Sequence, residues 1–369
     1  MAAIQILRLA GLVALLTVCQ PASPTTGQGG DGPQVATMHA ARAAHTATVL
    51  RSGQVLIVGG MDHGGGGLAS VELFDPADNA VQELGSIAEP RVSHTATLLP
   101  DGRVLIAGGY NGEYLSSVEV FDPTTRRFGP AGSLLEGRSG HTATLLPDGR
   151  VLFVGGVGRG WTFLRSAELY DPETGRSEAV DSMSVPRESH TATLLADGRV
   201  LVIGGHSGRR ENMEVYASGE VFSTETRRFE PAGTLGIPRH KHDAVELADG
   251  RVLVIGGADR TDRVHYETTE VYDPRTGTFA PGPSMANRRY KIAGTSVRLP
   301  SGDVLVTSGA EVAELLDLEG WAFREVSDRF PAAYRFAAAV LLQGGDVLVT
   351  GGYSDGNRNT SGIWRFQGL

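Results

Sequence analysis

Short apolar runs recur along the whole chain, separated by glycine, proline and aspartate, and none of them continues with a helical period. The clearest copy begins at Arg138 and reads HTATLL, then RVLFVGG, then SAELYD, and ends with a fourth short run near Met183. Runs of this length, bounded by turn-forming residues, are typical of β-strands. Each copy therefore predicts four short antiparallel strands.

The copies are marked by a double glycine after the second run, repeated at intervals of 43 to 52 residues. A fixed period of this size indicates a repeat architecture in which each unit is one supersecondary element. One pair is degenerate, with serine in place of the first glycine. The pairs are 59–60, 108–109, 155–156, 204–205, 256–257, 308–309 and 351–352.

Turn residues and burial favour one way of assembling these seven units. Pro147, Asp148 and Gly149 between the first two runs predict a tight hairpin, and Asp171 with Pro172 predicts the turn after the third run. The second run is apolar at nearly every position, as expected of a strand covered on both faces. Four-stranded sheets packed face to face around an axis provide that cover. The fold class is therefore all-β, a seven-bladed β-propeller.

The two ends of the repeat array complement each other. Residues 34–38 align with the fourth strand of the unit at 179–183, yet no first three strands precede them. The last unit ends with a third strand at 363–366 and lacks a fourth. We therefore expect the N-terminal strand to complete the last blade and close the ring, which removes exposed sheet edges.

These marks resemble the Kelch family, and the resemblance covers residues 34–369. Besides the double glycine, Kelch repeats carry two aromatic residues with six residues between them. Here those pairs are Phe121 with Phe128, Phe222 with Phe229, and Tyr272 with Phe279. The resemblance implies a Kelch-type propeller, distantly like that of the galactose oxidase family.

The first 33 residues do not read as part of the propeller. Residues 1–19 have the apolar run of a signal peptide, too short to span a bilayer. Leu16 to Cys19 resembles a bacterial lipobox, in which Cys19 is lipidated; the alternative is a plain signal peptide cut near Ala22. Residues 20–33 have the composition of a flexible linker. We expect an exported protein, either lipid-anchored in the cell envelope or secreted.

Charge narrows the choice of partners. The formal net charge of −9 argues against a general binder of nucleic acid or of anionic membranes, so membrane contact would come only through the lipid anchor. No linker interrupts residues 34–369, and we expect a single-domain monomer.

A repeated Arg-x-x-His pattern precedes the first strand of most units. In a propeller these loops share one face, here called the loop face, with the loops between the second and third strands. Five arginines and a lysine would then surround the channel mouth and suit an acidic ligand. The alternative is a structural arginine that bridges to a repeated glutamate. The candidates are Arg42, Arg91, Arg138, Arg187, Arg239 and Lys291.

The histidines of the pattern would be spread around a circle, which does not suit a metal site. Neither a metal site nor a catalytic constellation is predicted, and no cofactor. The loops between the second and third strands vary from blade to blade, as expected of a specificity surface. Their candidate binding residues are Tyr110, Tyr114, Trp161, His206, Tyr266 and Tyr353.

The sequence favours a non-catalytic binding module that captures a protein or glycan ligand at the channel mouth. The alternative is a carbohydrate-active enzyme, epimerase-like or oxidase-like. The resemblance to galactose oxidase implies a copper site with a tyrosine cross-linked to a cysteine. Cys19 is the only cysteine and falls in the leader, so the mature chain cannot form that cofactor.

Overall fold

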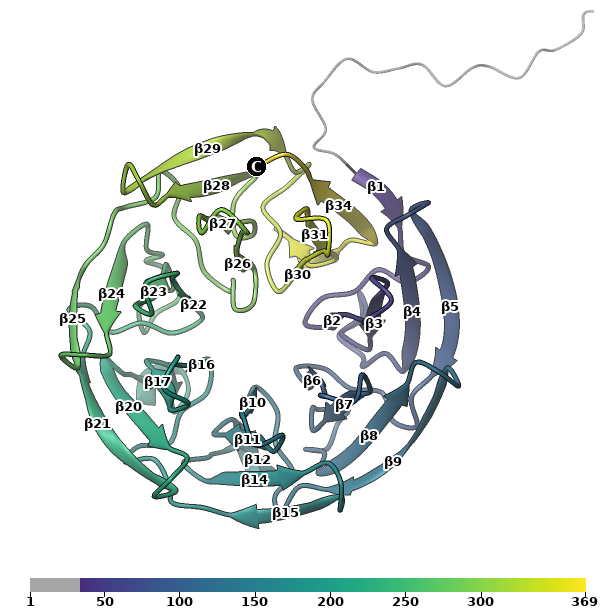
Figure 1. The fold of residues 1–369 in the computed structure, drawn as a ribbon, viewed down its shortest axis with the longest axis horizontal. Helices are drawn as coiled ribbons and strands as arrows, with labels where there is room; N and C mark the ends of the chain where they lie inside the picture. Colours follow the sequence, from purple (N-terminus) through teal and green to yellow (C-terminus); the bar gives the residue numbers. More distant parts are fainter. Residues whose placement is uncertain (1–33) are drawn as a thin grey trace, which may run out of the picture. The chain divides into compact units, whose positions relative to one another are not determined.

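The computed structural model describes residues 34–369, which form seven four-stranded antiparallel sheets arranged as the blades of a ring (Figure 1). The predicted seven-bladed propeller is confirmed. From the axis outward, blade 1 contains β2 (Thr46–Val49), β3 (Val55–Val58), β4 (Ser70–Asp75) and β5 (Ala80–Ser86). Blade 2 contains β6 (Thr95–Leu98), β7 (Val104–Ala107), β8 (Ser117–Asp122) and β9 (Arg127–Ser133).

The next three blades follow the same order. Blade 3 contains β10 (Thr142–Leu145), β11 (Val151–Val154), β14 (Ala167–Asp171) and β15 (Arg176–Ala179). Blade 4 contains β16 (Thr191–Leu194), β17 (Val200–Ile203), β20 (Ser218–Ser223) and β21 (Arg228–Thr234). Blade 5 contains β22 (Asp243–Glu246), β23 (Val252–Ile255), β24 (Thr269–Asp273) and β25 (Thr278–Pro281).

The last two blades complete the ring. Blade 6 contains β26 (Ser296–Arg298), β27 (Val304–Val306), β28 (Val312–Asp317) and β29 (Ala322–Arg329). Blade 7 contains β30 (Ala338–Leu341), β31 (Val347–Thr350), β34 (Gly362–Phe366) and β1 (Gln34–Thr37). Short elements in the loops are β12 (Val157–Gly158), η1 (Arg159–Trp161), β13 (Thr162–Phe163), β18 (His206–Ser207), η2 (Arg210–Asn212), β19 (Glu214–Val215), β32 (Tyr353–Ser354) and β33 (Arg358–Asn359).

Closure of the ring follows the prediction. β1 pairs antiparallel with β34, with Thr37 opposite Gly362, although the two strands stand at opposite ends of the sequence. Figure 1 shows β1 as the outer strand of the blade that contains β30, β31 and β34. The sequence ends of residues 34–369 therefore meet in one sheet.

The core is divided among the spaces between blades, and the second strand of each blade contributes to two of them. In β3, Leu56 and Val58 pack toward blade 2, while Val55 and Ile57 pack toward blade 7. Successive strand residues point to opposite faces, so a strand covered on both sides must be apolar throughout. This explains the uninterrupted apolar runs in the sequence.

The double glycine permits the next blade to approach closely. A Cβ on Gly59 would lie 2.8 Å from the carbonyl oxygen of Arg91 and 2.9 Å from the His94 ring. Both residues belong to the loop that leads into blade 2. Gly59 also has φ of 60°, which other residues adopt less readily. The repeated glycines are therefore required by packing between blades.

Candidate functional site

In each of blades 1 to 5, one arginine is buried beneath the loop face and does not line the channel. In blade 3, Arg138 donates hydrogen bonds to the carbonyl oxygens of Gly155 and Ser166 and, at 2.8 Å, to the carboxylate of Glu168. The side chains of Arg138 and Glu168 are each 1% exposed. The same ion pair recurs as Arg42–Glu72, Arg91–Glu119, Arg187–Glu220 and Arg239–Glu270.

The prediction that the repeated arginines bind a ligand is therefore wrong, because their guanidinium groups do not reach solvent. It concerned Arg42, Arg91, Arg138, Arg187 and Arg239. The structural alternative describes them correctly. The paired glutamate also accepts a backbone N–H from the segment that leads in from the preceding blade, as Glu168 does from Leu135 at 2.7 Å. Each ion pair thus fastens a linker to the blade it enters.

The repeated histidines tie neighbouring blades together. His94 Nε2 lies 3.1 Å from Thr46 Oγ1 of blade 1, and His141 makes the equivalent contact with Thr95 of blade 2. Burial lowers the pKa of His94 to about 3, so its ring is neutral at neutral pH. Burial also lowers the pKa of His45, His141, His190 and His242.

Blade 6 departs from this pattern. The buried partner of Glu314 is Arg289, at 2.6 Å, so Arg289 and not Lys291 occupies the place of the repeated arginine. Blade 6 also lacks the histidine. In its place, the Asp243 carboxylate of blade 5 accepts backbone N–H groups from residues 294–296. The sequence alignment of Lys291 with the repeated arginines is therefore wrong by two positions, and Arg289 is the residue that aligns with them.

Lys291 instead belongs to a belt of residues around the central opening, one from each blade. Their backbones share φ values between 50° and 62°, and hydrogen bonds join neighbours around the ring. Lys291 N donates to Lys241 O at 2.8 Å, for example, and Phe336 N donates to Lys291 O at 2.9 Å. We call this belt the inner rim: Ala44, Ser93, Gly140, Ser189, Lys241, Lys291 and Phe336.

A cavity of about 230 Å³, here called the mouth cavity, lies within the inner rim. Lys241 and Lys291 both line it, and they are the only lysines among the 369 residues of the chain. Lys241 Nζ is 2.5 Å from Asp262 Oδ2. Lys291 Nζ donates a hydrogen bond to the Tyr353 hydroxyl at 2.6 Å and makes no salt bridge with any residue from 34 to 369.

Three of the predicted loop aromatics lie together on the loop face. The ring centroids of Tyr110 and Tyr114 are 5.0 Å apart, and Trp161 of blade 3 lies 5.7 Å from Tyr114. The Arg209 guanidinium of blade 4 stacks on the indole, 3.2 Å from its centroid. Trp161 remains 48% exposed. Burial raises the pKa of Tyr114 to about 12, and its hydroxyl has no partner among the described residues.

The predicted residue His206 is buried and belongs to a row of polar side chains beside the mouth cavity. Its Nε2 lies 3.3 Å from Glu188 Oε2, and its Nδ1 lies 3.1 Å from Nδ1 of His240. Nε2 of His240 then lies 3.1 Å from Asp262 Oδ1. Burial raises the pKa of Glu188 to about 7 and lowers that of His206 to about 3.

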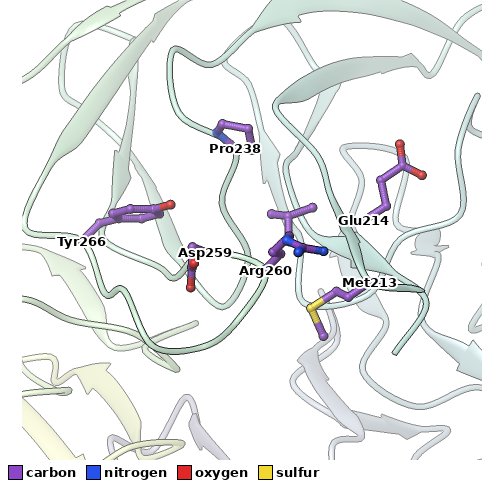
Figure 2. Close-up of a pocket in the computed structure, with 7 residues that line it drawn as sticks. Met213, Glu214, Pro238, Asp259, Arg260 and Tyr266 are labelled. Carbon is purple, nitrogen blue, oxygen red and sulfur yellow. The ribbon is translucent and has the colours of Figure 1, made fainter. Parts of the chain in front are cut away.

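Tyr266 lines a separate hollow of about 390 Å³ between the loops of blades 4 and 5, here called the outer pocket. Figure 2 shows Tyr266 on one side of it, with Met213 and Glu214 opposite and Arg260 between them. Pro238 also lines this pocket, and Lys241, three residues later, lines the mouth cavity. One segment of blade 5 thus borders both hollows.

Sequence reasoning missed the residues that surround the mouth cavity most closely. Glu188, Lys241, His240 and Asp262 were not candidates, because their roles depend on which loops meet in space. One signal was available in the sequence: within the Arg-x-x-His pattern of blade 5, Lys241 stands where blades 1 to 4 have alanine, serine or glycine.

Comparisons with known proteins agree with this architecture. The family model of the Kelch motif matches residues 91–133 and 244–286, which correspond to most of blades 2 and 5. A search of curated proteins finds no match to the chain. Among solved structures, the chain is similar to a novel fungal alcohol oxidase of the AA5 family, in complex with copper. The identity is 16%, the TM-score is 0.71, and the match covers 91% of this chain and 76% of the oxidase chain.

The fold and the repeated motif define the class of protein: residues 34–369 form a seven-bladed β-propeller with Kelch repeats. The chain is a Kelch-repeat protein, as its sequence resemblance implied. Its likeness to the galactose oxidase type of propeller is one of fold, because the identity to the oxidase is low.

Residues 34–369 include no cysteine, and no three His, Cys, Asp or Glu side chains among them are grouped to hold a metal ion. No helix in this part of the chain is both long enough and apolar enough to cross a membrane. Cys19, the predicted lipidation site, lies outside the described residues.

Proposed function

We propose that this chain is a non-catalytic binding module that holds an acidic glycan on its loop face, with a carboxylate of the ligand in the mouth cavity. The observation that carries this proposal is the placement of lysine. The chain contains only two lysines, and both belong to the inner rim, on adjacent blades. All its other permanently charged basic side chains are arginines. Both lysines line the mouth cavity.

The charge balance around the cavity supports an anionic ligand. Lys241 shares its charge with Asp262, whereas Lys291 contacts only the Tyr353 hydroxyl within hydrogen-bond distance. The rings of Tyr290, Phe336 and Tyr353 lie 5.1 to 5.6 Å from the Lys291 ammonium. These rings restrict the position of the ammonium group and do not neutralise its charge. A ligand carboxylate could therefore form an ion pair with it. The cavity is thus locally basic on a chain of net charge −9.

The aromatic cluster supports a glycan over an acidic peptide. Trp161, Tyr110 and Tyr114 form an aromatic platform on the loop face, and the indole of Trp161 is about half exposed. Aromatic faces pack well against apolar surfaces, and the C–H face of a sugar ring is such a surface. A uronate-containing chain matches both the platform and the cations.

The test is a glycan array that compares uronate-containing, other acidic and neutral glycans, with acidic peptides as a further class. We expect selective binding of uronate-containing glycans. Replacing Lys291→Met should then weaken binding about 10- to 100-fold, because a hydrogen bond to a charged group contributes about 1.5–3 kcal/mol. Lys291→Arg should restore part of the affinity.

Arg159→Met provides the matched control, since Arg159 is an exposed cation on the same face that does not line the mouth cavity. Binding of neutral glycans alone, or equal loss in both variants, would contradict the proposal. If the chain bound acidic peptides and no glycans, the proposed glycan ligand would be wrong and the ligand would be an acidic peptide.

A carbohydrate-active enzyme is the second candidate, favoured by one observation. Glu188 lines the mouth cavity, and burial raises its pKa to about 7, the range that suits a general acid or base. Incubating the chain with the bound glycan and following the sugar by NMR distinguishes the two. An unchanged glycan supports the binding module, and a new product supports the enzyme.

A further inference from the structure

Four loops bring four ionisable side chains into one row beside the mouth cavity. Glu188 belongs to the loop that leads into blade 4, His206 to the loop that follows β17, and His240 to the loop that leads into blade 5. Asp262 lies in the loop after β23. Glu188 and His206 also pair through their backbones, at 2.9 Å in both directions, which holds their side chains next to each other.

One contact in this row fixes the position of a hydrogen. His240 Nε2 lies 3.1 Å from the carbonyl oxygen of Asp259, which can only accept, so His240 Nε2 carries a hydrogen. His240 Nδ1 and His206 Nδ1 are 3.1 Å apart, so one of them must donate and the other accept. Three arrangements satisfy both contacts.

In the first arrangement His240 is neutral, so its bare Nδ1 accepts from Nδ1–H of His206. A neutral His206 then has a bare Nε2, and this atom faces Glu188 Oε2 at 3.3 Å. Two unprotonated atoms would repel at that distance, so the Glu188 carboxyl must carry a proton. In the second arrangement His240 is a cation, His206 accepts at Nδ1 and donates from Nε2 to the Glu188 carboxylate. In the third arrangement His240 is neutral, and His206 is a cation that donates from Nδ1 to His240 and from Nε2 to the Glu188 carboxylate.

All three arrangements hold the same number of protons. The three residues carry one proton more than an ionised Glu188 beside two neutral imidazoles would. We propose that Glu188, His206 and His240 share this single extra proton, and that its position on Glu188 leaves a neutral carboxyl beside a ligand carboxylate in the mouth cavity.

The surroundings favour the arrangement with the proton on Glu188. Burial raises the pKa of Glu188 to about 7, with Asp262 adding to the rise and Lys241 and Arg209 opposing it. Burial lowers the pKa of His206 to about 3, and the nearby charges of His240 and Lys241 act in the same direction. The remaining titratable groups that face the row are Tyr114, His190 and His242.

The inner rim leaves room for the Glu188 carboxyl at one position. A Cβ on Gly140 would lie 2.8 Å from Glu188 Oε1, so the carboxyl rests directly on this glycine. Ala44 and Ser93 occupy the equivalent rim positions with similar backbone angles, so the backbone alone does not demand glycine there. The small residue serves the carboxyl, which then faces the cavity.

The consequence for binding rests on the proposed function. A protonated Glu188 is uncharged and does not repel a ligand carboxylate, whereas an ionised Glu188 would repel it. Binding should therefore be strongest while the extra proton is retained. Above about pH 7 the affinity for a uronate-containing glycan should fall by as much as tenfold per pH unit, the limit for a coupled single proton.

The first experiment needs no ligand. Nitrogen NMR of the histidine side chains in the free chain, from pH 5.5 to 9, should show His206 and His240 changing together in one step near neutral pH. His94 should remain in one neutral form. Glu188→Gln should abolish the step, because its amide supplies a permanent donor to His206, whereas Glu211→Gln, an exposed control on the same face, should leave it intact.

The second experiment measures binding of a uronate-containing glycan across the same pH range. The native chain and Glu211→Gln should lose affinity above neutral pH, and Glu188→Gln should bind with constant affinity. Unchanging His206 and His240 signals, or pH-independent binding by the native chain, would overturn the shared proton. A clear NMR step without any glycan binding would support the shared proton and refute the proposed function instead.

Discussion

Replacing Arg138→Ala tests whether the repeated arginines hold the blades together. The guanidinium donates to two carbonyl oxygens, to the Ser166 hydroxyl and to Glu168, all within a buried site. The variant leaves the Glu168 carboxylate buried without its cation. Removing one partner of a buried ion pair typically costs about 3–5 kcal/mol, and we expect a loss of stability in this range.

The corresponding change in melting temperature follows from the size of the ring. Unfolding entropies of about 2.1 cal/mol/K per residue give about 0.7 kcal/mol/K for residues 34–369, so Tm should fall by about 4–7 °C. Scanning calorimetry measures this shift. Arg138→Met combined with Glu168→Gln should recover much of the loss, since the amide oxygen can still accept from Leu135 N and no charge remains buried.

Arg150→Ala is the matched control within blade 3. Arg150 pairs with Asp148 in an exposed turn, with side chains 26% and 45% exposed, and surface pairs of this kind contribute less than about 1 kcal/mol. Equal shifts in the two single variants would refute the reasoning. If Arg138→Ala left Tm unchanged and abolished ligand binding, the repeated arginines would have a binding role and not a structural one.

The remaining predictions concern the blade contacts. His94 and His190 have folded-state pKa values of about 3, below the ordinary value, so stability should be lost as the pH falls below about 6.5. Each should cost about 2 kcal/mol at pH 5, measured by urea unfolding. Deleting residues 34–38 should cost more than about 3 kcal/mol, from the buried Met38 and the lost edge strand, and an unchanged Tm would reject the closure. Gly140→Ala should displace the Glu188 carboxyl and alter the histidine NMR step, while Tm changes little; an unaltered step would reject the contact.

The ring was predictable because it depends on features that every blade must repeat. The double glycine, the apolar second strand and the hairpin turns serve the same packing in each unit, so their period is visible in one sequence. The closure was predictable for the same reason, since an unpaired fourth strand at residue 34 and a missing one after residue 366 are departures from that period.

The role of the arginines was not predictable from the period alone. A residue repeated in five blades is equally compatible with a ring of ligand contacts and with a repeated internal pair. Burial decides between them, and burial depends on how far Glu168 and its equivalents lie below the loop face. The error at Lys291 has a simpler cause. The segment from Arg289 to Ser308, whose carbonyl oxygen accepts from this arginine, is two residues longer than the segment from Arg138 to Gly155. Counting back from the glycine pair therefore selected the wrong residue.

The candidate site arises where the inner rim departs from its own symmetry. A sevenfold ring offers seven equivalent rim positions, and four consecutive ones carry small side chains: Ala44, Ser93, Gly140 and Ser189. The other three carry Lys241, Lys291 and Phe336. The opening is therefore wide over blades 1 to 4 and lined by cations at blades 5 and 6. A ligand on the axis would meet this asymmetry, so its carboxylate is drawn off-centre toward the two lysines. There Glu188, resting on the one rim glycine, is placed to sense it.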